Sequence, residues 1–169
     1  MGAVSFSIDA GLVVALKSAL PLEVFVETGT WEGDSVERVR DLFREIRSVE
    51  VSRPIYEGAR QRFAGLEHVE LSCCSSVEAL TRWIPELRTR SVLYFLDAHW
   101  CAGAETATTA TMTSQCPLLE ELHAIGTLND ESVIIIDDAR LFLAPPPAPH
   151  DDSHWADLIS VLHALRAGS

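Results

Sequence analysis

Apolar residues follow two patterns that alternate along the chain. Short apolar runs predict strands at residues 24–28, 47–52, 68–72, 91–97 and 132–137. Other segments have apolar residues at helical spacing, which predicts helices that begin near residues 9, 34, 54, 76, 117 and 155. Because the runs at 91–97 and 132–137 are almost continuous, we expect strands that helices bury on both faces. The alternation predicts an α/β fold with a doubly wound, mostly parallel sheet of about five strands.

Polar residues and prolines mark the ends of several predicted helices. Asp9 is placed to cap the first helix, and Pro21 is placed to end it. Asp34, with Glu37 three residues later, resembles a capping box for the next helix. The apolar face of that helix is formed by Val36, Val39, Leu42, Phe43 and Ile46. We therefore expect the second strand to begin only after this face ends, at residue 47.

The composition supports a single domain with a hydrophobic core. Of the 169 residues, 47% are hydrophobic and 22% are charged, which argues against a disordered chain. We expect residues 1–169 to form one domain. Within it we distinguish an N-terminal helix at 1–21, a core at 22–137, and a proline-rich loop with a C-terminal helix at 138–169.

Charge, apolar run length and cysteine spacing narrow the range of partners. The formal net charge is −12 and no local Lys/Arg cluster reverses it, so we expect no nucleic acid partner. No apolar run approaches the roughly 20 residues that span a bilayer. The N-terminus also lacks a basic signal region, and we expect a cytoplasmic protein without membrane association. The four cysteines form no CxxC pair, which favours reduced thiols.

Ligands of parallel α/β sheets bind outside the carboxyl ends of the strands. After the first predicted strand, the dinucleotide pattern GxGxxG would require glycines at positions 29, 31 and 34. Trp31 and Asp34 occupy two of these positions, and no Walker-type Gly-Lys-Ser/Thr follows. The sequence therefore disfavours NAD, FAD and a phosphate loop.

What remains after the first strand is an ExGxxxG pattern, formed by Glu27, Gly29 and Gly33. A ligand with an ammonium group and two ribose hydroxyls, but no phosphate, would use one acid at the first strand and another at the second. S-adenosylmethionine is such a ligand. Glu27 would face its ammonium group, Gly29 would let the backbone approach, and Glu50 would accept hydrogen bonds from both ribose hydroxyls. The alternative is that the two acids only solvate strand ends.

The chain from Val24 to about Ile136 resembles the class I, Rossmann-like S-adenosylmethionine-dependent methyltransferases. It is most similar to small bacterial methyltransferase-like proteins, through FLDAHW at 95–100, CPLLEEL at 116–122 and IIIDDARLF at 134–142. The resemblance implies the strand order 3-2-1-4-5 and a small-molecule acceptor. It extends the cofactor site to Thr28, Thr30, Val51, Ser75, Ser76 and Asp97. Ser75 stands where many members have an aspartate that faces adenine.

Three aspartates are expected to converge on one rim of the sheet. Asp97 follows the fourth strand, and Asp137 and Asp138 follow the fifth. Three carboxylates suit Mg²⁺, Mn²⁺ or Ca²⁺. The alternative is that Asp138 caps a turn and Asp97 points to water. The arrangement resembles metal-dependent O-methyltransferases, in which the ion binds the acceptor hydroxyl and lowers its pKa.

Catechol-type enzymes of this kind carry a lysine base just after the acid of the fourth strand. Here the only lysine is Lys17, on the first predicted helix. We expect His99 to serve as the general base instead, with Asp97 as the second catalytic residue. The alternative is that His99 is a packed, hydrogen-bonded side chain beside Trp100.

The resemblance also implies two further strands, which the chain does not show. The fifth strand would then be an unprotected edge, covered by a partner chain, by the C-terminal helix or by a further segment. One expectation is therefore a homo-oligomer that forms through this edge. The segment LAPPPAPHDDSHW at 143–155 is expected either to border the acceptor entrance or to be a plain surface connection.

These observations lead to one expected function and two alternatives. We expect metal-assisted O-methylation of a small hydroxylated metabolite. The alternatives are a non-catalytic S-adenosylmethionine-binding module and a methyltransferase-like protein that only oligomerises.

Overall fold

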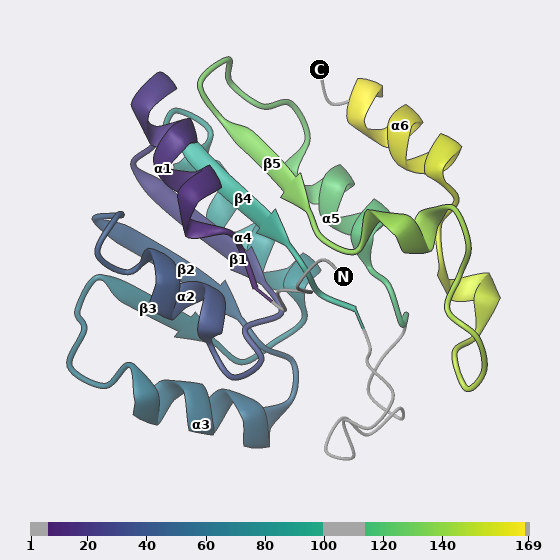
Figure 1. The fold of residues 1–169 in the computed structure, drawn as a ribbon, viewed down its shortest axis with the longest axis horizontal. Coiled ribbons are helices and arrows are strands. Elements are labelled where there is room, and N and C mark those ends of the chain that lie inside the picture. The colour runs from purple at the N-terminus through teal and green to yellow at the C-terminus, as the bar shows by residue number, and fades with distance from the viewer. Residues whose placement is uncertain (1–6, 100–113, 168–169) are drawn as a thin grey trace.

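The computed structural model of the chain describes residues 7–99 and 114–167. It contains one sheet of five parallel strands in the order β3-β2-β1-β4-β5 (Figure 1). The strands are β1 (Val24–Thr28), β2 (Glu45–Val49), β3 (Val69–Ser72), β4 (Val92–Leu96) and β5 (Val133–Ile136). The predicted fold class and the predicted strand order are therefore confirmed.

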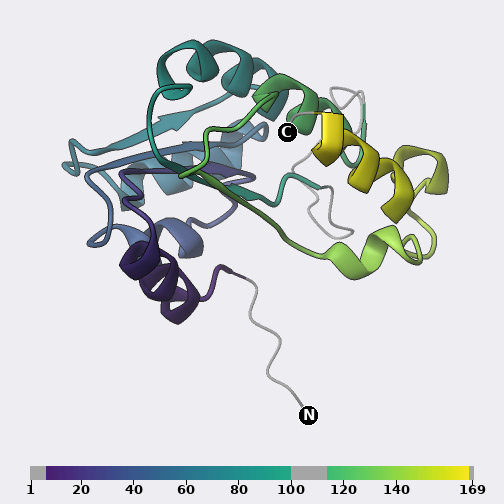
Figure 2. The ribbon, with the colours of Figure 1, turned by 90° about the horizontal axis from the view of Figure 1, so that it is seen from above.

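Helices cover both faces of the sheet. They are α1 (Ala10–Ala19), α2 (Asp34–Val39), α3 (Arg53–Arg62), α4 (Ser76–Leu87), α5 (Leu118–Ile125) and α6 (Leu158–Ala167). Figure 2 shows α1 and α2 below the sheet and α4 and α5 above it. The switch of faces occurs at the crossover from β3 to β4, which carries the chain from one edge of the sheet past β2 and β1. The loops that follow β1 and β4 therefore diverge at the centre of the sheet, where α/β proteins bind ligands.

The core consists of two apolar layers, one on each face of the sheet. Successive strand residues point to opposite faces, so Phe25 packs with Leu93 and Phe95 in the layer under α1 and α2. Val26 and Tyr94 pack in the other layer, with α4 and α5. Every residue of β1 and β4 is buried, which agrees with the nearly continuous apolar run at 91–97.

The helix after β1 is much shorter than the sequence pattern predicts. α2 ends at Val39, and β2 begins at Glu45 rather than at residue 47. Ile46 is a strand residue that pairs with Phe25 and Val69. The prediction failed because Leu42, Phe43 and Ile46 all pack in the same apolar layer as α2. Residues after α2 that are buried on the same side of the sheet therefore gave an apolar spacing like that of a longer helix.

The start of α2 also differs from the predicted capping box. Gly33 takes the N-cap position with a φ of 85°, and no side chain caps the helix. Asp34 lies inside the first turn, and its carboxylate pairs with the guanidinium of Arg62 at 2.7 Å. By contrast, the predicted cap at Asp9 is confirmed, since its carboxylate accepts a hydrogen bond from the Leu12 N–H.

The C-terminal part of the chain lies beside β5 and α5. Two short 3-10 turns, η2 (Ala139–Phe142) and η3 (Asp152–His154), lead to α6, which packs against α5. Within the described residues β5 pairs only with β4, so no strand lies along its outer edge. In this part of the chain the C-terminal helix adds to the helical layer and does not extend the sheet. None of the described helices combines the length and the apolar character needed to cross a membrane.

Candidate functional site at the carboxyl ends of the strands

The loop between β1 and α2 is fixed between the ends of its two neighbouring strands. The N–H groups of Gly29 and Thr30 both donate to the Val49 carbonyl at the end of β2, at 2.9 and 3.1 Å. On the other side, the Asp97 N–H donates to the Thr28 carbonyl at 3.1 Å. The loop is thereby held at the centre of the sheet's carboxyl edge. The residues predicted for the cofactor site lie along this edge, in the loops that follow β1, β2, β3 and β4.

The glycine at position 29 is required by both conformation and space. Its φ is 83°, in the region that favours glycine, and a Cβ there would lie 2.6 Å from the Asp97 carbonyl oxygen. Gly33 also has a positive φ, and a side chain there would strike the ring of Phe63. Trp31, with a φ of 48°, adopts the same left-handed region without being glycine. The backbone between β1 and α2 is therefore compact and strained.

Glu50 stands at the end of β2 with its carboxylate directed at this loop. Its Oε2 accepts the Trp31 N–H at 3.0 Å, and its Oε1 accepts the Ser52 N–H at 2.8 Å. Burial raises the pKa of Glu50, and the backbone hydrogen bonds counteract that effect. Each oxygen keeps a second lone pair for another donor. Beside it, the exposed side chain of Val51 presents an apolar surface.

Glu27 lies buried at the end of β1, beneath the loop. Its side chain is 1% exposed, and its Oε2 accepts the Ser48 hydroxyl at 2.6 Å. The Ser48 hydroxyl in turn lies 2.6 Å from that of Thr30. Burial raises the pKa of Glu27 to about 8, so the carboxyl is mostly protonated at neutral pH. This group supports the loop from below, and its direct contact with an ammonium group stays a prediction.

The two serines after β3 lie at the N-terminus of α4. Ser75 is exposed and caps the helix, because its hydroxyl accepts the Glu78 N–H. Ser76 is buried. Both serines lie at the carboxyl edge of the sheet, and their contact with adenine stays a prediction. The sequence predicted that one of the two serines caps the helix, and the structure shows that it is Ser75.

His99 lies between two of the predicted aspartates. Its Nδ1 is 3.3 Å from Oδ1 of Asp97, and its Nε2 is 3.3 Å from Oδ2 of Asp138. Burial raises the pKa of Asp97, whereas the hydrogen bond with His99 lowers it. The structure thus brings the predicted base and the ends of β4 and β5 together.

The predicted metal site is not found. Over residues 7–99 and 114–167, no three acidic, histidine or cysteine side chains are grouped so that they could hold a metal ion. The reason is that other groups occupy the carboxylates of Asp97, Asp137 and Asp138. His99 contacts two of them, Arg140 pairs with Asp138, and the Asp138 N–H donates to Asp137 at 2.7 Å. An incoming cation would have to displace these contacts.

Comparisons with solved structures identify the fold. A Staphylococcus aureus protein assigned as a caffeoyl-CoA O-methyltransferase matches with a TM-score of 0.59 and 12% identity, over 94% of this chain and 73% of that one. The YcgJ protein of Bacillus subtilis matches with a TM-score of 0.55 and 13% identity, over 94% and 66%. A geranyl diphosphate methyltransferase in complex with SAM matches with a TM-score of 0.54 and 14% identity, over 94% and 64%.

The chain has the class I methyltransferase fold. It spans less than two thirds of several proteins of this fold, including 64% of the geranyl diphosphate enzyme. Searches with protein-family models and among curated protein sequences found no match.

In this methyltransferase fold, the C-terminal segment contacts His99 through Trp155. The Trp155 ring lies edge-on to His99, with ring centroids 5.8 Å apart, and His150 lies 5.9 Å from the same ring. That the proline-rich segment borders the acceptor entrance stays a prediction. Residues 100–113, which precede α5, lie outside the described residues.

One buried acid of this methyltransferase fold was missed by the sequence analysis. Glu121 of α5 is 1% exposed and shares a small hollow with Asp97, His99 and Trp155. The signal was present in the sequence, because Glu121 takes a position in the apolar stripe of Leu118, Leu122 and Ile125. An acid in such a stripe has a polar environment or a ligand.

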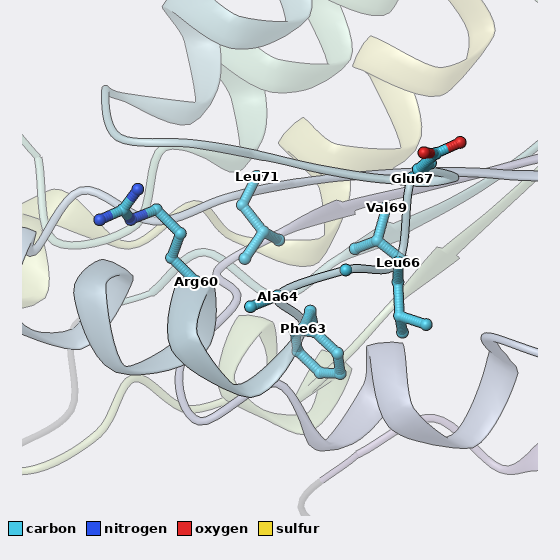
Figure 3. A pocket seen from close by; sticks show the side chains of 8 residues that line it. Arg60, Phe63, Ala64, Leu66, Glu67, Val69 and Leu71 are labelled. Carbon is cyan, nitrogen blue, oxygen red and sulfur yellow. The ribbon is translucent and has the colours of Figure 1, made fainter.

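A larger hollow lies away from these residues. It measures about 230 Å³ and is formed by the end of α3, the following turn and β3 (Figure 3). Phe63, Leu66 and Leu71 give it apolar walls, with Arg60 and Glu67 at its rim. None of the predicted site residues lines it, so its size alone does not make it the catalytic site.

Proposed function

We propose that this protein transfers a methyl group from S-adenosylmethionine to a hydroxyl group of a small metabolite. The observation that carries the proposal is the pairing of a buried, backbone-held Glu50 with a glycine loop that leaves no room for a side chain at position 29. The class I methyltransferase fold, and a solved methyltransferase of that fold bound to SAM, support it.

The residues present fit this cofactor. Both oxygens of Glu50 have lone pairs available for the two ribose hydroxyls, and Val51 offers an apolar surface for the adenine ring. Gly29 allows the backbone to approach the methionine part. The amide groups at the start of α4 and Ser76 would lie on the side of the adenine edge.

The cofactor would supply an electrophilic methyl group, and the chain would prepare the acceptor oxygen. Asp97 would hold the Nδ1–H of His99, and the acceptor hydroxyl would replace Asp138 at Nε2, whose lone pair would take its proton. Asp138, on the Nε2 side, would then stabilise the positively charged imidazolium.

We propose no role for a metal ion in this mechanism. The carboxylates that would bind Mg²⁺, Mn²⁺ or Ca²⁺ are engaged by His99, Arg140 and the Asp138 N–H. We therefore assign to His99 the activation that a cation would provide.

The proposal is tested by measuring S-adenosylhomocysteine formation with a panel of phenols, sugars and primary amines. We expect turnover with a hydroxyl acceptor. With that acceptor His99→Gln should lower kcat at least 100-fold, because general-base catalysis contributes about 10² to 10⁴. His123→Gln, at the end of α5, is the matched control and should leave kcat unchanged. Turnover with amines alone, or full activity of His99→Gln, would contradict the proposal.

We further propose that two copies associate through the outer edge of β5. Support comes from the edge itself, which has no strand beside it in the described part of the chain. Light scattering during gel filtration would report a dimer if the proposal holds and a monomer at all concentrations if it does not.

A further inference from the structure

Two of the residues that line the small hollow beside His99 each carry a buried polar atom without a partner. The hollow measures about 20 Å³ and lies between the ends of β4 and β5, α5 and the C-terminal segment. Oε1 of Glu121 and Nε1 of Trp155 are both buried, and neither has a hydrogen-bond partner among the described residues. Both residues line the hollow. Leaving such groups unsatisfied is unfavourable, so a ligand that satisfied both would be favoured.

The two atoms differ in what they require. The indole Nε1–H is only a donor, whereas a carboxylate oxygen is only an acceptor. Burial raises the pKa of Glu121 to about 7, against the effect of nearby Ser76 and Thr28 hydroxyls, so the carboxylate form prevails above neutral pH. A hydroxyl group can donate to one atom and accept from the other. An ammonium group can only donate, and an ether oxygen can only accept.

The size of the hollow sets the same limit. A volume of about 20 Å³ is enough for a single group of the size of water. A methyl group of that size would leave both polar atoms unsatisfied. His99 and Trp155 both line the hollow, and their rings contact each other edge-on with centroids 5.8 Å apart.

We propose that Glu121 and Trp155 form a subsite for one hydroxyl group of the acceptor, distinct from the hydroxyl that is methylated. This inference rests on the proposed function. The bound hydroxyl keeps its proton because it donates to Glu121, while the reacting hydroxyl gives its proton to His99. The acceptor class is therefore a molecule with at least two hydroxyl groups.

The subsite is tested by binding, without cofactor or turnover. The probe is phenol, which is titrated at pH 8 into protein with ¹⁵N-labelled tryptophan. The Trp155 indole N–H signal is assigned by its loss in Trp155→Phe. We expect phenol to shift this signal. We expect anisole and toluene, which cannot donate a hydrogen bond, to bind about tenfold more weakly.

Variants of α5 separate the subsite from general effects on the helix. Glu121→Leu removes the acceptor and should weaken phenol binding about tenfold, since one hydrogen bond to a charged group is lost. Glu120→Leu, at the neighbouring exposed position, is the matched control and should bind phenol like the unchanged protein. If Glu121→Leu unfolds, Glu121→Gln with the same titration replaces it, and about a threefold loss is expected.

The outcomes distinguish this inference from the proposed function. Equal affinity for phenol, anisole and toluene, or unchanged phenol affinity in the Glu121 variants, would overturn the subsite. An unshifted Trp155 signal with every probe would overturn it as well. Absence of S-adenosylmethionine binding would instead reject the proposed function, and the phenol titration would remain valid because it contains no cofactor.

Discussion

A methyl group added at Gly29 should destabilise the protein more than one added at a glycine that has free space around it. In Gly29→Ala the new Cβ would lie 2.6 Å from the Asp97 carbonyl oxygen, at a φ of 83°. The left-handed conformation costs about 1–2 kcal/mol for a residue with a Cβ. Overpacking against fixed backbone costs about 1–3 kcal/mol more. We therefore expect the free energy of unfolding to fall by about 2–5 kcal/mol.

The chain contains a control that separates these two costs. Gly65 has a φ of 90°, but nothing lies within 4 Å of a Cβ placed there. Gly65→Ala should therefore lose only the conformational part, about 1–2 kcal/mol. Gly58 lies inside α3, also with nothing within 4 Å, and Gly58→Ala should stabilise the helix by about 0.5–1 kcal/mol.

Urea denaturation of the three variants measures these differences directly. The comparison that matters is Gly29→Ala against Gly65→Ala, because both share the unfavourable φ and only one has the close contact. If the two variants lose the same stability, the inference that the β1–α2 loop packs tightly against Asp97 is wrong. The same two variants should also differ in cofactor affinity, with a loss only at position 29.

Further predictions concern protonation and metal. Burial raises the folded pKa of Glu27 from 4.5 to about 8, so its stabilising contribution is lost as pH rises from about 4.5 to about 8. Glu27→Gln should flatten that part of the pH–stability curve measured by urea denaturation, and an unchanged slope would refute the buried carboxyl. Glu121 adds a similar slope over a narrower pH range, because its pKa rises from 4.5 only to about 7. Chelation with EDTA should leave cofactor affinity and turnover intact. If EDTA abolished turnover and Mg²⁺ restored it, a metal ion and not His99 would be the activating group.

From the sequence, the sheet and the position of its ligand-binding edge could be predicted better than the local geometry could. The apolar runs and the glycines at 29 and 33 were sufficient because strand burial and tight turns leave direct signatures. The end of α2 was missed because Phe43 and Ile46 pack in the same layer as the helix, and burial alone does not report secondary structure. The metal site was predicted from three acids, but sequence spacing could not show that His99 and Arg140 engage them.

Glu121 shows a different limit of sequence reasoning. Its segment was recognised as a helix, yet the surroundings of this buried acid depend on residues 24 and 34 positions away along the chain, namely Asp97 and Trp155. Contacts between β4, α5 and the C-terminal segment form only when the sheet has been assembled. The site edge could be predicted, whereas the pairing of side chains across it could not.

The central claim is that Glu50 and the glycine loop hold S-adenosylmethionine, and isothermal titration tests it most directly. We expect S-adenosylmethionine and S-adenosylhomocysteine to bind the unchanged protein. Glu50→Ala should weaken both by about 1.5–3 kcal/mol, because hydrogen bonds to a charged acceptor are lost. Glu57→Ala, at an exposed helix of the same crossover, is the control. Absence of heat with folded protein, or equal affinity in the Glu50 and Glu57 variants, would contradict the account.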